Sequence, residues 1–262
     1  MADKNSPIGV FDSGIGGLTI LKKIRTLMKH EDIIYFADTA SCPYGERSRE
    51  EIIELSRKAI RLLIEKGVKV IVIACNTAST TSSAVLRHEF SIPIIATEPA
   101  VKPAVENTKS GIIGVLATRS TIESGQIDRL ALMYGKDVKV IKQIGHSLVD
   151  IVEGGKTTSP QAKELLESYI SPMVELGCDH IVLGCTHYPF LKSTIFSILK
   201  DKGKDDIKVI DTAEPVAKRV RSVLQDNDLT TDRLDDGTTT FISSSASQSG
   251  EQLQAIFNTI NR

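Results

Sequence analysis

The chain has 262 residues, 41% hydrophobic and 25% charged, so it can bury the core of one or two domains. Its 32 basic residues nearly balance 33 acidic ones, which excludes the basic excess typical of proteins that bind nucleic acid or anionic membranes. No apolar run approaches the roughly 20 residues that span a bilayer, and residues 1–7 lack a signal-peptide apolar region. We therefore expect a cytoplasmic protein whose partner is a small molecule.

Short apolar runs alternate with helical patterns through the first part of the chain. We expect strands at 8–11, 33–36, 68–74 and 92–96, and helices at 18–29, 50–66 and 78–89. A glycine-rich turn from Asp12 to Gly17 follows the first strand, and a polar loop at 38–49 contains Pro43, Tyr44 and Gly45. Continuously apolar strands that alternate with helices indicate an α/β fold with mainly parallel sheets.

The pattern then starts again near residue 111. Gly9-Val10 recurs as Gly114-Val115, the segment 67–75 recurs as 177–185, and 94–97 recurs as 209–212. One such match is typical of any βα repeat, but three in the same order indicate two related halves. We predict two pseudo-symmetric α/β domains, one formed by residues 99–212 and the other by residues 1–98 together with the tail 213–262, since the tail has no third half to join.

The repeated apolar strand ends in a cysteine both times, at Cys75 and at Cys185. Open α/β sheets bind ligands at the carboxyl ends of their strands. A buried small hydrophobe would explain either cysteine alone, but not two at equivalent places. In a cleft between the domains, one thiol on each face of a substrate carbon could remove a proton and deliver another, which inverts a stereocentre.

The residues beside the two cysteines are not repeated. Asp12 ends the first strand, whereas its counterpart is Ala117; His187 follows Cys185, whereas its counterpart is Thr77. A turn cap explains Asp12 alone equally well, and a lone histidine such as His187 is more often structural. Together they predict a site that treats the two faces of its substrate differently.

Four segments resemble, in order and spacing, the signatures of bacterial glutamate racemases, and the match covers essentially the whole chain. They are Asp12-Ser-Gly-Ile-Gly-Gly17, Pro43-Tyr-Gly45, Ala74-Cys-Asn-Thr77 and Gly184-Cys-Thr-His-Tyr-Pro189. The resemblance implies a racemase that needs no cofactor or metal and converts L-glutamate to D-glutamate for peptidoglycan synthesis. It also implies a homodimer.

The resemblance further implies a set of site residues. Cys75 would act on the Cα proton of D-glutamate with help from Asp12, and Cys185 on that of L-glutamate with help from His187, which Glu153 would support. From the sequence alone, Glu153 is an exposed residue at a helix end. The implied substrate contacts are Asp12, Ser13, Tyr44, Gly45, Asn76, Thr77, Thr186 and His187, while Cys42 and Cys178 inherit no role.

Several other functions can be formulated from the same residues. The glycine-rich turn could indicate a dinucleotide site, but Thr19 stands where the third glycine belongs. A metal site could be formed by Cys178, His180, Cys185 and His187, but Cys178 and Cys185 lie about 23 Å apart along a strand, which opposes it. An acyl-transfer enzyme could use Cys185 and His187, but this function leaves Cys75 unexplained. A non-catalytic binding module explains neither cysteine. A racemase of a related substrate, such as aspartate, stays open.

Overall fold

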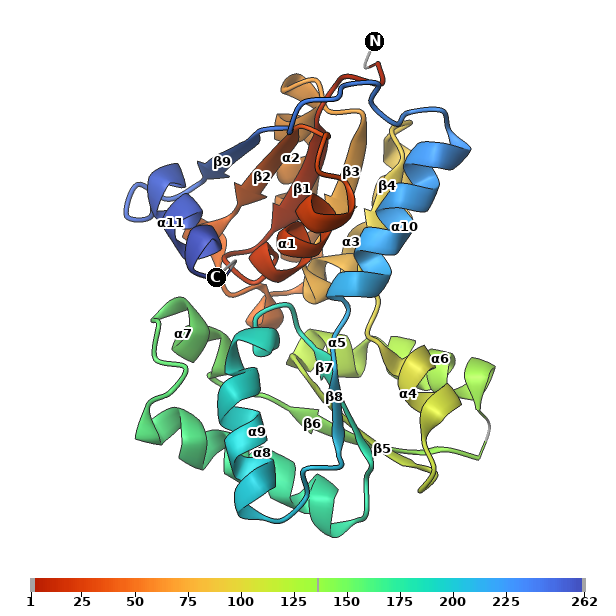
Figure 1. The fold of residues 1–262 in the computed structure, drawn as a ribbon, viewed down its shortest axis with the longest axis vertical. Coiled ribbons are helices and arrows are strands. Elements are labelled where there is room, and N and C mark those ends of the chain that lie inside the picture. The colour runs from red at the N-terminus through yellow and green to blue at the C-terminus, as the bar shows by residue number, and fades with distance from the viewer. Residues whose placement is uncertain (1–2, 136, 261–262) are drawn as a thin grey trace. The chain divides into compact units, whose positions relative to one another are not determined.

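The computed structural model describes residues 3–135 and 137–260, which form two compact units (Figure 1). The first unit contains Met1–Glu98 and Ala213–Arg262, and the second contains Pro99–Thr212. Every strand pair in both sheets is parallel, which confirms the α/β fold expected from the apolar runs. Within the described ranges, no helix has the length and apolar character needed to cross a bilayer.

The first unit is a five-stranded sheet with helices on both faces (Figure 1). Its spatial order is β4 (Ile94–Ala96), β3 (Val70–Ile73), β1 (Ile8–Asp12), β2 (Ile33–Ala37) and β9 (Thr239–Ser243). Its helices are α1 (Leu18–Leu27), α2 (Arg49–Glu65), α3 (Asn76–Glu89), α10 (Ala213–Asp226) and α11 (Gly250–Ile260), with short 3₁₀ turns η1 (Thr39–Ser41) and η2 (Tyr44–Glu46). The pair α1 and α10 lies on one face, and the pair α2 and α3 lies on the other.

The second unit is a four-stranded sheet that repeats this plan. Its spatial order is β6 (Lys139–Ile144), β5 (Ile112–Ala117), β7 (His180–Gly184) and β8 (Lys208–Ile210). Its helices are α4 (Val101–Asn107), α5 (Arg119–Glu123), α6 (Gln126–Tyr134), α7 (Leu148–Glu153), α8 (Pro160–Glu175) and α9 (Lys192–Asp201), with the 3₁₀ turn η3 (Tyr188–Leu191). Read from β8, the order β8-β7-β5-β6 matches β4-β3-β1-β2, so the two sheets share one topology.

The repeated glycines have the same task in both units. A Cβ on Gly9 of β1 would come within 3.3 Å of Leu63 on α2, and a Cβ on Gly114 of β5 would come within 2.5 Å of Met173 on α8. In each unit the helix before the cysteine strand therefore packs directly on the backbone of the central strand. A Cβ at either glycine would therefore require the facing side chain, Leu63 or Met173, to move.

The tail completes the first unit. Its strand β9 pairs with β2, and α10 packs against α1. Near the amino ends of β2 and β3, the buried Lys69 ammonium pairs with Glu31, whose other carboxylate oxygen accepts a hydrogen bond from the Thr231 backbone N–H at 2.9 Å. A buried charge pair is stabilising only when its remaining bonding capacity is used, and here the tail uses it.

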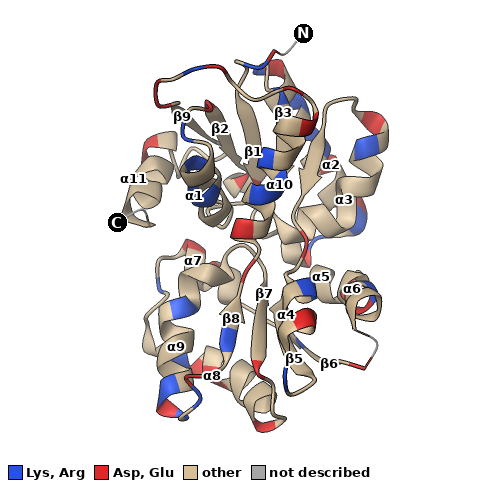
Figure 2. Ribbon diagram, turned by 45° about the vertical axis from the view of Figure 1, so that its right-hand side comes forward, with Lys and Arg blue, Asp and Glu red and all other residues tan. Residues whose placement is uncertain are grey.

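Charges are mixed over the outer helices of each unit. Figure 2 shows Lys and Arg interspersed with Asp and Glu on helices and loops, with few on the strands. Exposed pairs such as Lys142 with Asp128 follow this pattern and contribute little to stability individually.

One carboxylate anchors the start of the second sheet. Asp179, just before β7, accepts hydrogen bonds from the Thr108 hydroxyl at 2.7 Å and from the backbone N–H groups of Lys109 and Ser110 at 2.6 and 2.9 Å. The His180 ring lies 2.8 Å from the same carboxylate. Burial by itself raises the pKa of Asp179, but the hydrogen bonds from His180, Thr108 and the two N–H groups outweigh it and hold this pKa below its ordinary value.

We predict that Asp179→Asn lowers the free energy of unfolding at pH 7 by about 2 kcal/mol, because it removes charged hydrogen bonds. A carboxylate whose pKa is lower in the folded state contributes its full stabilisation when the pH is above its pKa in the unfolded chain, about 3.9. This contribution is lost as the pH falls toward the pKa in the folded state. The difference between wild type and variant should thus be constant from pH 7 to about 5 and shrink below about 4. Urea unfolding followed by circular dichroism measures it, with Asp128→Asn as the exposed control; an unchanged difference at pH 3 would contradict the assignment.

Candidate active site

The carboxyl ends of β1 and β3 bring together the first group of predicted residues. Strand β1 lies between β2 and β3, so the chain leaves its sheet in opposite directions on the two sides of this point. Crevices at such points are where open α/β sheets bind ligands. Asp12 ends β1 and Cys75 follows β3, and the Ser13 hydroxyl lies 3.5 Å from the Cys75 sulfur.

Cys75 caps the amino end of α3. Its sulfur accepts a hydrogen bond from the Ala78 backbone N–H at 3.4 Å, and the residue is 5% exposed. The positive end of the helix dipole favours a thiolate at this place. The local structure therefore supplies an activating environment for the first thiol.

Asp12 is fully buried, and its Oδ1 accepts a hydrogen bond from the Gly14 backbone N–H at 2.8 Å. This bond caps the turn, as the structural interpretation of the sequence expected, and it keeps the carboxylate beside the cysteine end of the sheet. Gly17 makes the arrangement possible, because a Cβ there would lie 2.7 Å from the Asp12 Cβ and 3.0 Å from the Ala74 Cβ.

Tyr44 forms a wall of the same region. Its ring centroid lies 6.1 Å from that of Phe11, and its hydroxyl donates to Asp38 Oδ2 at 2.7 Å. Burial raises the pKa of Tyr44 far above its ordinary value, and the charge of Asp38 and the hydrogen bond to it raise it further. Tyr44 is therefore a neutral donor. Asp38 was not predicted as a site residue, and its position one residue after β2 was the signal that could have revealed it.

Asn76 has an unusual environment. Its side chain is 1% exposed, and among the described residues neither its amide nitrogen nor its amide oxygen has a hydrogen-bond partner. An unpaired buried amide costs free energy, so native proteins retain one mainly where something else binds it. Thr77 beside it is 3% exposed, and Gly45 follows Tyr44 within η2.

In the second unit, Cys185 follows β7 as Cys75 follows β3. The His187 Nδ1 lies 3.8 Å from the Cys185 sulfur, and its Nε2 lies 2.6 Å from Glu153 Oε1. A carboxylate at Nε2 selects the tautomer whose unprotonated Nδ1 faces the thiol. Glu153 does end α7, but its side chain is only 21% exposed, so the expectation of an exposed residue was wrong. His187 lies directly against its carboxylate.

Tyr188 supports this second group and was not predicted. Its hydroxyl donates to the Gly145 carbonyl at 3.0 Å, and its backbone N–H donates to the Cys185 carbonyl at 3.1 Å. Burial raises the pKa of Tyr188 well above its ordinary value, and charges at Cys185 and Tyr169 add to the shift. The motif that contains Thr186 and His187 also contains Tyr188, which was the available signal. Thr186 is 2% exposed beside them.

The other cysteines differ from these two. Cys178 precedes β7 and so lies at the opposite end of that strand from Cys185, as the argument against a metal site predicted. Burial raises the pKa of Cys178 to about 11, and the charge of Asp179 adds to the shift. Such a thiol is chemically inert at neutral pH.

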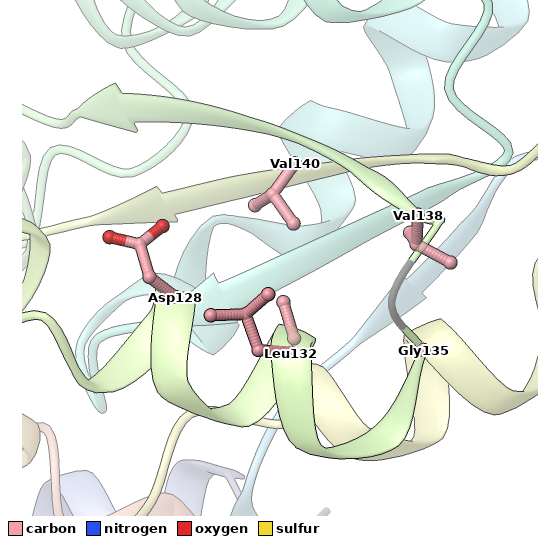
Figure 3. Close-up of a pocket in the computed structure, with 6 residues that line it drawn as sticks. Asp128, Leu132, Gly135, Val138 and Val140 are labelled. Atoms are coloured by element: carbon pink, nitrogen blue, oxygen red, sulfur yellow. The ribbon is translucent and has the colours of Figure 1, made fainter.

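A pocket of about 260 Å³ lies between α6 and the start of β6 (Figure 3). It is lined by Asp128, Ala131, Leu132, Gly135, Val138 and Val140. None of these is a predicted site residue, and the one charged group, Asp128, is paired with Lys142. The pocket opens at the amino end of β6, whereas Cys185 follows the carboxyl end of β7.

Comparisons with known proteins agree on one family. The model of the Asp/Glu/Hydantoin racemase family matches residues 8–220. A glutamate racemase of Herpetosiphon aurantiacus is 42% identical over 92% of this chain and 93% of its own. The crystal structure of glutamate racemase isoform RacE1 from Bacillus anthracis superposes with a TM-score of 0.88 at 32% identity, covering 98% of this chain and 95% of that one. A glutamate racemase from Francisella tularensis in complex with D-glutamate has a TM-score of 0.84 at 32% identity, covering 98% and 94%.

We predict that Glu153→Gln slows alkylation of Cys185 by iodoacetamide about tenfold at pH 7, because a neutral amide holds the His187 tautomer less firmly and weakens it as a base. Peptide mass spectrometry measures both cysteines in one sample, and alkylation of Cys75 should be unchanged. Glu167→Gln, at an exposed carboxylate on α8, is the matched control. Equal rates at Cys185 in wild type and Glu153→Gln would show that the carboxylate does not act on the thiol.

Proposed function

Because the chain belongs to the Asp/Glu/hydantoin racemase family, we propose that it interconverts L-glutamate and D-glutamate. The observation that carries this proposal is the pair of buried cysteines, Cys75 and Cys185, at the ends of two topologically equivalent strands. Relatives named glutamate racemases at 42% to 44% identity support the choice of glutamate as substrate.

The proposed reaction moves one proton at each cysteine. One thiolate removes the Cα proton and becomes a thiol, while the other thiol donates its proton to the opposite face and becomes a thiolate. Each thiol exchanges one proton with Cα, so the protons balance over the reaction, and the proposed reaction includes neither pyridoxal phosphate nor a metal ion. This mechanism requires both thiols at one Cα atom, with Cys75 acting on D-glutamate and Cys185 on L-glutamate.

Each thiol has its own helper in this proposal. Asp12 assists Cys75, whose thiolate the amino end of α3 also favours. His187 assists Cys185 through the contact between Nδ1 and sulfur, and Glu153 holds the ring. The two half-reactions thus depend on different groups, which accords with the unrepeated residues in the sequence.

Backbone and side-chain hydrogen-bond donors beside the cysteines are proposed to hold the two substrate carboxylates. Asn76 supports this role best, because its buried amide has bonding capacity that the described residues leave unused. The other proposed contacts are Asp12, Ser13, Tyr44, Gly45, Thr77, Thr186 and His187. An amide or hydroxyl donor binds a carboxylate strongly where water is excluded.

Two related activities compete with this proposal. An aspartate racemase would use the same chemistry on a shorter side chain. A Cys-His acyl-transfer enzyme is suggested by the relay from Cys185 through His187 to Glu153, since such a relay also activates a nucleophile. Circular dichroism assays with both enantiomers of glutamate and aspartate separate the racemases, and an acyl-transfer enzyme would invert neither.

We propose a use for the product and a compartment for the protein. D-glutamate would supply peptidoglycan synthesis, as the family resemblance implies. None of the four cysteines, Cys42, Cys75, Cys178 and Cys185, forms a disulfide bond, which suits the reducing conditions of the cytoplasm.

We predict that the protein is a homodimer in solution. Large apolar side chains are exposed on the single chain, among them Leu132 at 65% and Met133 at 59%, and such surface favours association. Light scattering after gel filtration should therefore give twice the chain mass of 28.5 kDa. A mass of one chain at micromolar concentration would refute the dimer without bearing on the reaction.

We predict that in heavy water L-glutamate yields D-glutamate with deuterium at Cα, while L-glutamate recovered early stays protiated. The reason is that the delivered hydrogen comes from the second thiol, which has exchanged with solvent before turnover. Chiral separation followed by mass spectrometry measures both pools. Early product that keeps the substrate hydrogen would indicate a single base.

Cys75→Ala and Cys185→Ala should each reduce racemisation by about 10³-fold, because inversion requires a donor opposite the acceptor. Cys178→Ala removes a buried thiol outside the proposed site and should leave the rate unchanged. A Cys75→Ala enzyme with near wild-type activity would exclude the two-thiol mechanism.

A further inference from the structure

The last carbonyl of β3 has more hydrogen bonds than a sheet requires. The Ile73 carbonyl accepts from the Ser79 hydroxyl at 3.0 Å, from the Thr97 hydroxyl at 2.8 Å and from the Thr97 backbone N–H at 3.2 Å. The Ser79 hydroxyl in turn accepts from the Thr97 N–H at 2.9 Å. Ser79 is 2% exposed and Thr97 is fully buried, so these bonds are shielded from water. We call Ser79 and Thr97 the β3 brace.

The brace ties together the three elements around Cys75. Ile73 ends β3 two residues before Cys75, Ser79 lies in the first turns of α3, and Thr97 follows the neighbouring strand β4. The Ser79 backbone N–H also donates to the Cys75 carbonyl at 2.8 Å. The brace therefore ties the first turns of α3, whose Ala78 N–H donates to the Cys75 sulfur, to the ends of β3 and β4.

The helix itself does not need a serine at this position. Alanine is a better helix former than serine, and the Ser79 hydroxyl bonds to a strand carbonyl outside its own helix. Ser82, one turn later, offers a direct comparison. It is equally buried, but its hydroxyl bonds to the Ala78 carbonyl within the same helix at 2.6 Å. Of these two hydroxyls, that of Ser79 connects the helix to the sheet and that of Ser82 does not.

The second unit lacks the serine half of this brace. The repeat that aligns Cys75 with Cys185 aligns Ser79 with Pro189, which has no side-chain donor. There the cysteine is followed by the 3₁₀ turn η3 instead of an α-helix, and the His187 ring approaches the thiol. The two units thus position their cysteines by different means.

We propose that Ser79 and Thr97 are positioning residues that control the reactivity of the Cys75 thiol by holding the amino end of α3 against it. This proposal rests on the proposed function where it concerns turnover, but not where it concerns the thiol. Loss of the brace lets the helix end move away from the sulfur. Fewer Cys75 thiols are then ionised at a given pH, and the remaining thiolate is less well aimed.

The test uses two variants that each remove one hydroxyl of the brace, Ser79→Ala and Thr97→Val. Thr97→Ser keeps the hydroxyl at its position, and Ser82→Ala is the matched control. Alkylation of Cys75 and Cys185 by iodoacetamide is followed in the same sample by peptide mass spectrometry from pH 6 to about 10. We expect the Cys75 profile of Ser79→Ala and Thr97→Val to move to higher pH, with alkylation about tenfold slower at pH 7. Cys185 should react as in wild type in every variant.

The kinetics of D-glutamate racemisation provide a second test of the brace. With D-glutamate, Ser79→Ala and Thr97→Val should lower kcat about tenfold with little change in KM, since the brace does not touch the substrate. Thr97→Ser and Ser82→Ala should keep wild-type values. Absence of racemisation in the wild type would refute the proposed function alone, because the alkylation profiles would still report on the brace.

Two results would contradict the proposed role of the brace. One is a wild-type Cys75 profile in both Ser79→Ala and Thr97→Val. The other is equal slowing of Cys75 and Cys185, which would indicate general loosening of the fold. Thermal unfolding shows whether each variant is folded at the assay temperature; if Ser79→Ala is not, Thr97→Val, which keeps the shape of the side chain, decides the question.

Discussion

Parallel pairing of one central strand with two neighbours is the constraint on which the rest of each unit depends. Strand β1 pairs with both β2 and β3, so the segments that follow β1 and β3 must emerge side by side at one edge. The same holds for β5 between β6 and β7. Because of this pairing, Ser13 and Cys75 lie in contact although 62 positions separate them. Polar chemistry can concentrate there without disturbing the apolar core of either sheet.

Much of this fold is predictable because buried parallel strands have continuous apolar sequences. The runs that contain β1, β3 and β7 stand out, and so do Gly9 and Gly114, whose close helix contacts explain their repetition. Strand β6 was not predicted. It lies at the edge of its sheet, where water reaches it, and Lys139, Lys142 and Gln143 interrupt its apolar pattern.

Less of the candidate site than of the fold can be predicted from the sequence. The cysteines and their immediate neighbours can be located because they directly follow recognisable strands. Contacts between distant side chains leave no such trace: Glu153 contacts a residue 34 positions away, and the bonds of Ser79 and Thr97 join three elements. Neither periodicity nor composition encodes those contacts. They arise only when helices and strands pack, which is why Tyr188, Asp38 and the brace were not predicted.

The discontinuous first unit also affects how the protein is made. On the ribosome, residues 99–212 are all available before the tail is synthesised, so the second unit can fold while the first still lacks β9 and α10. During that interval β2 is an unprotected sheet edge, and the buried Glu31 has not yet met the Thr231 N–H. At about 10 residues per second, the nascent chain spends several seconds in this state. Chaperone demand should therefore concentrate on the amino-terminal sheet, although its strands are synthesised first.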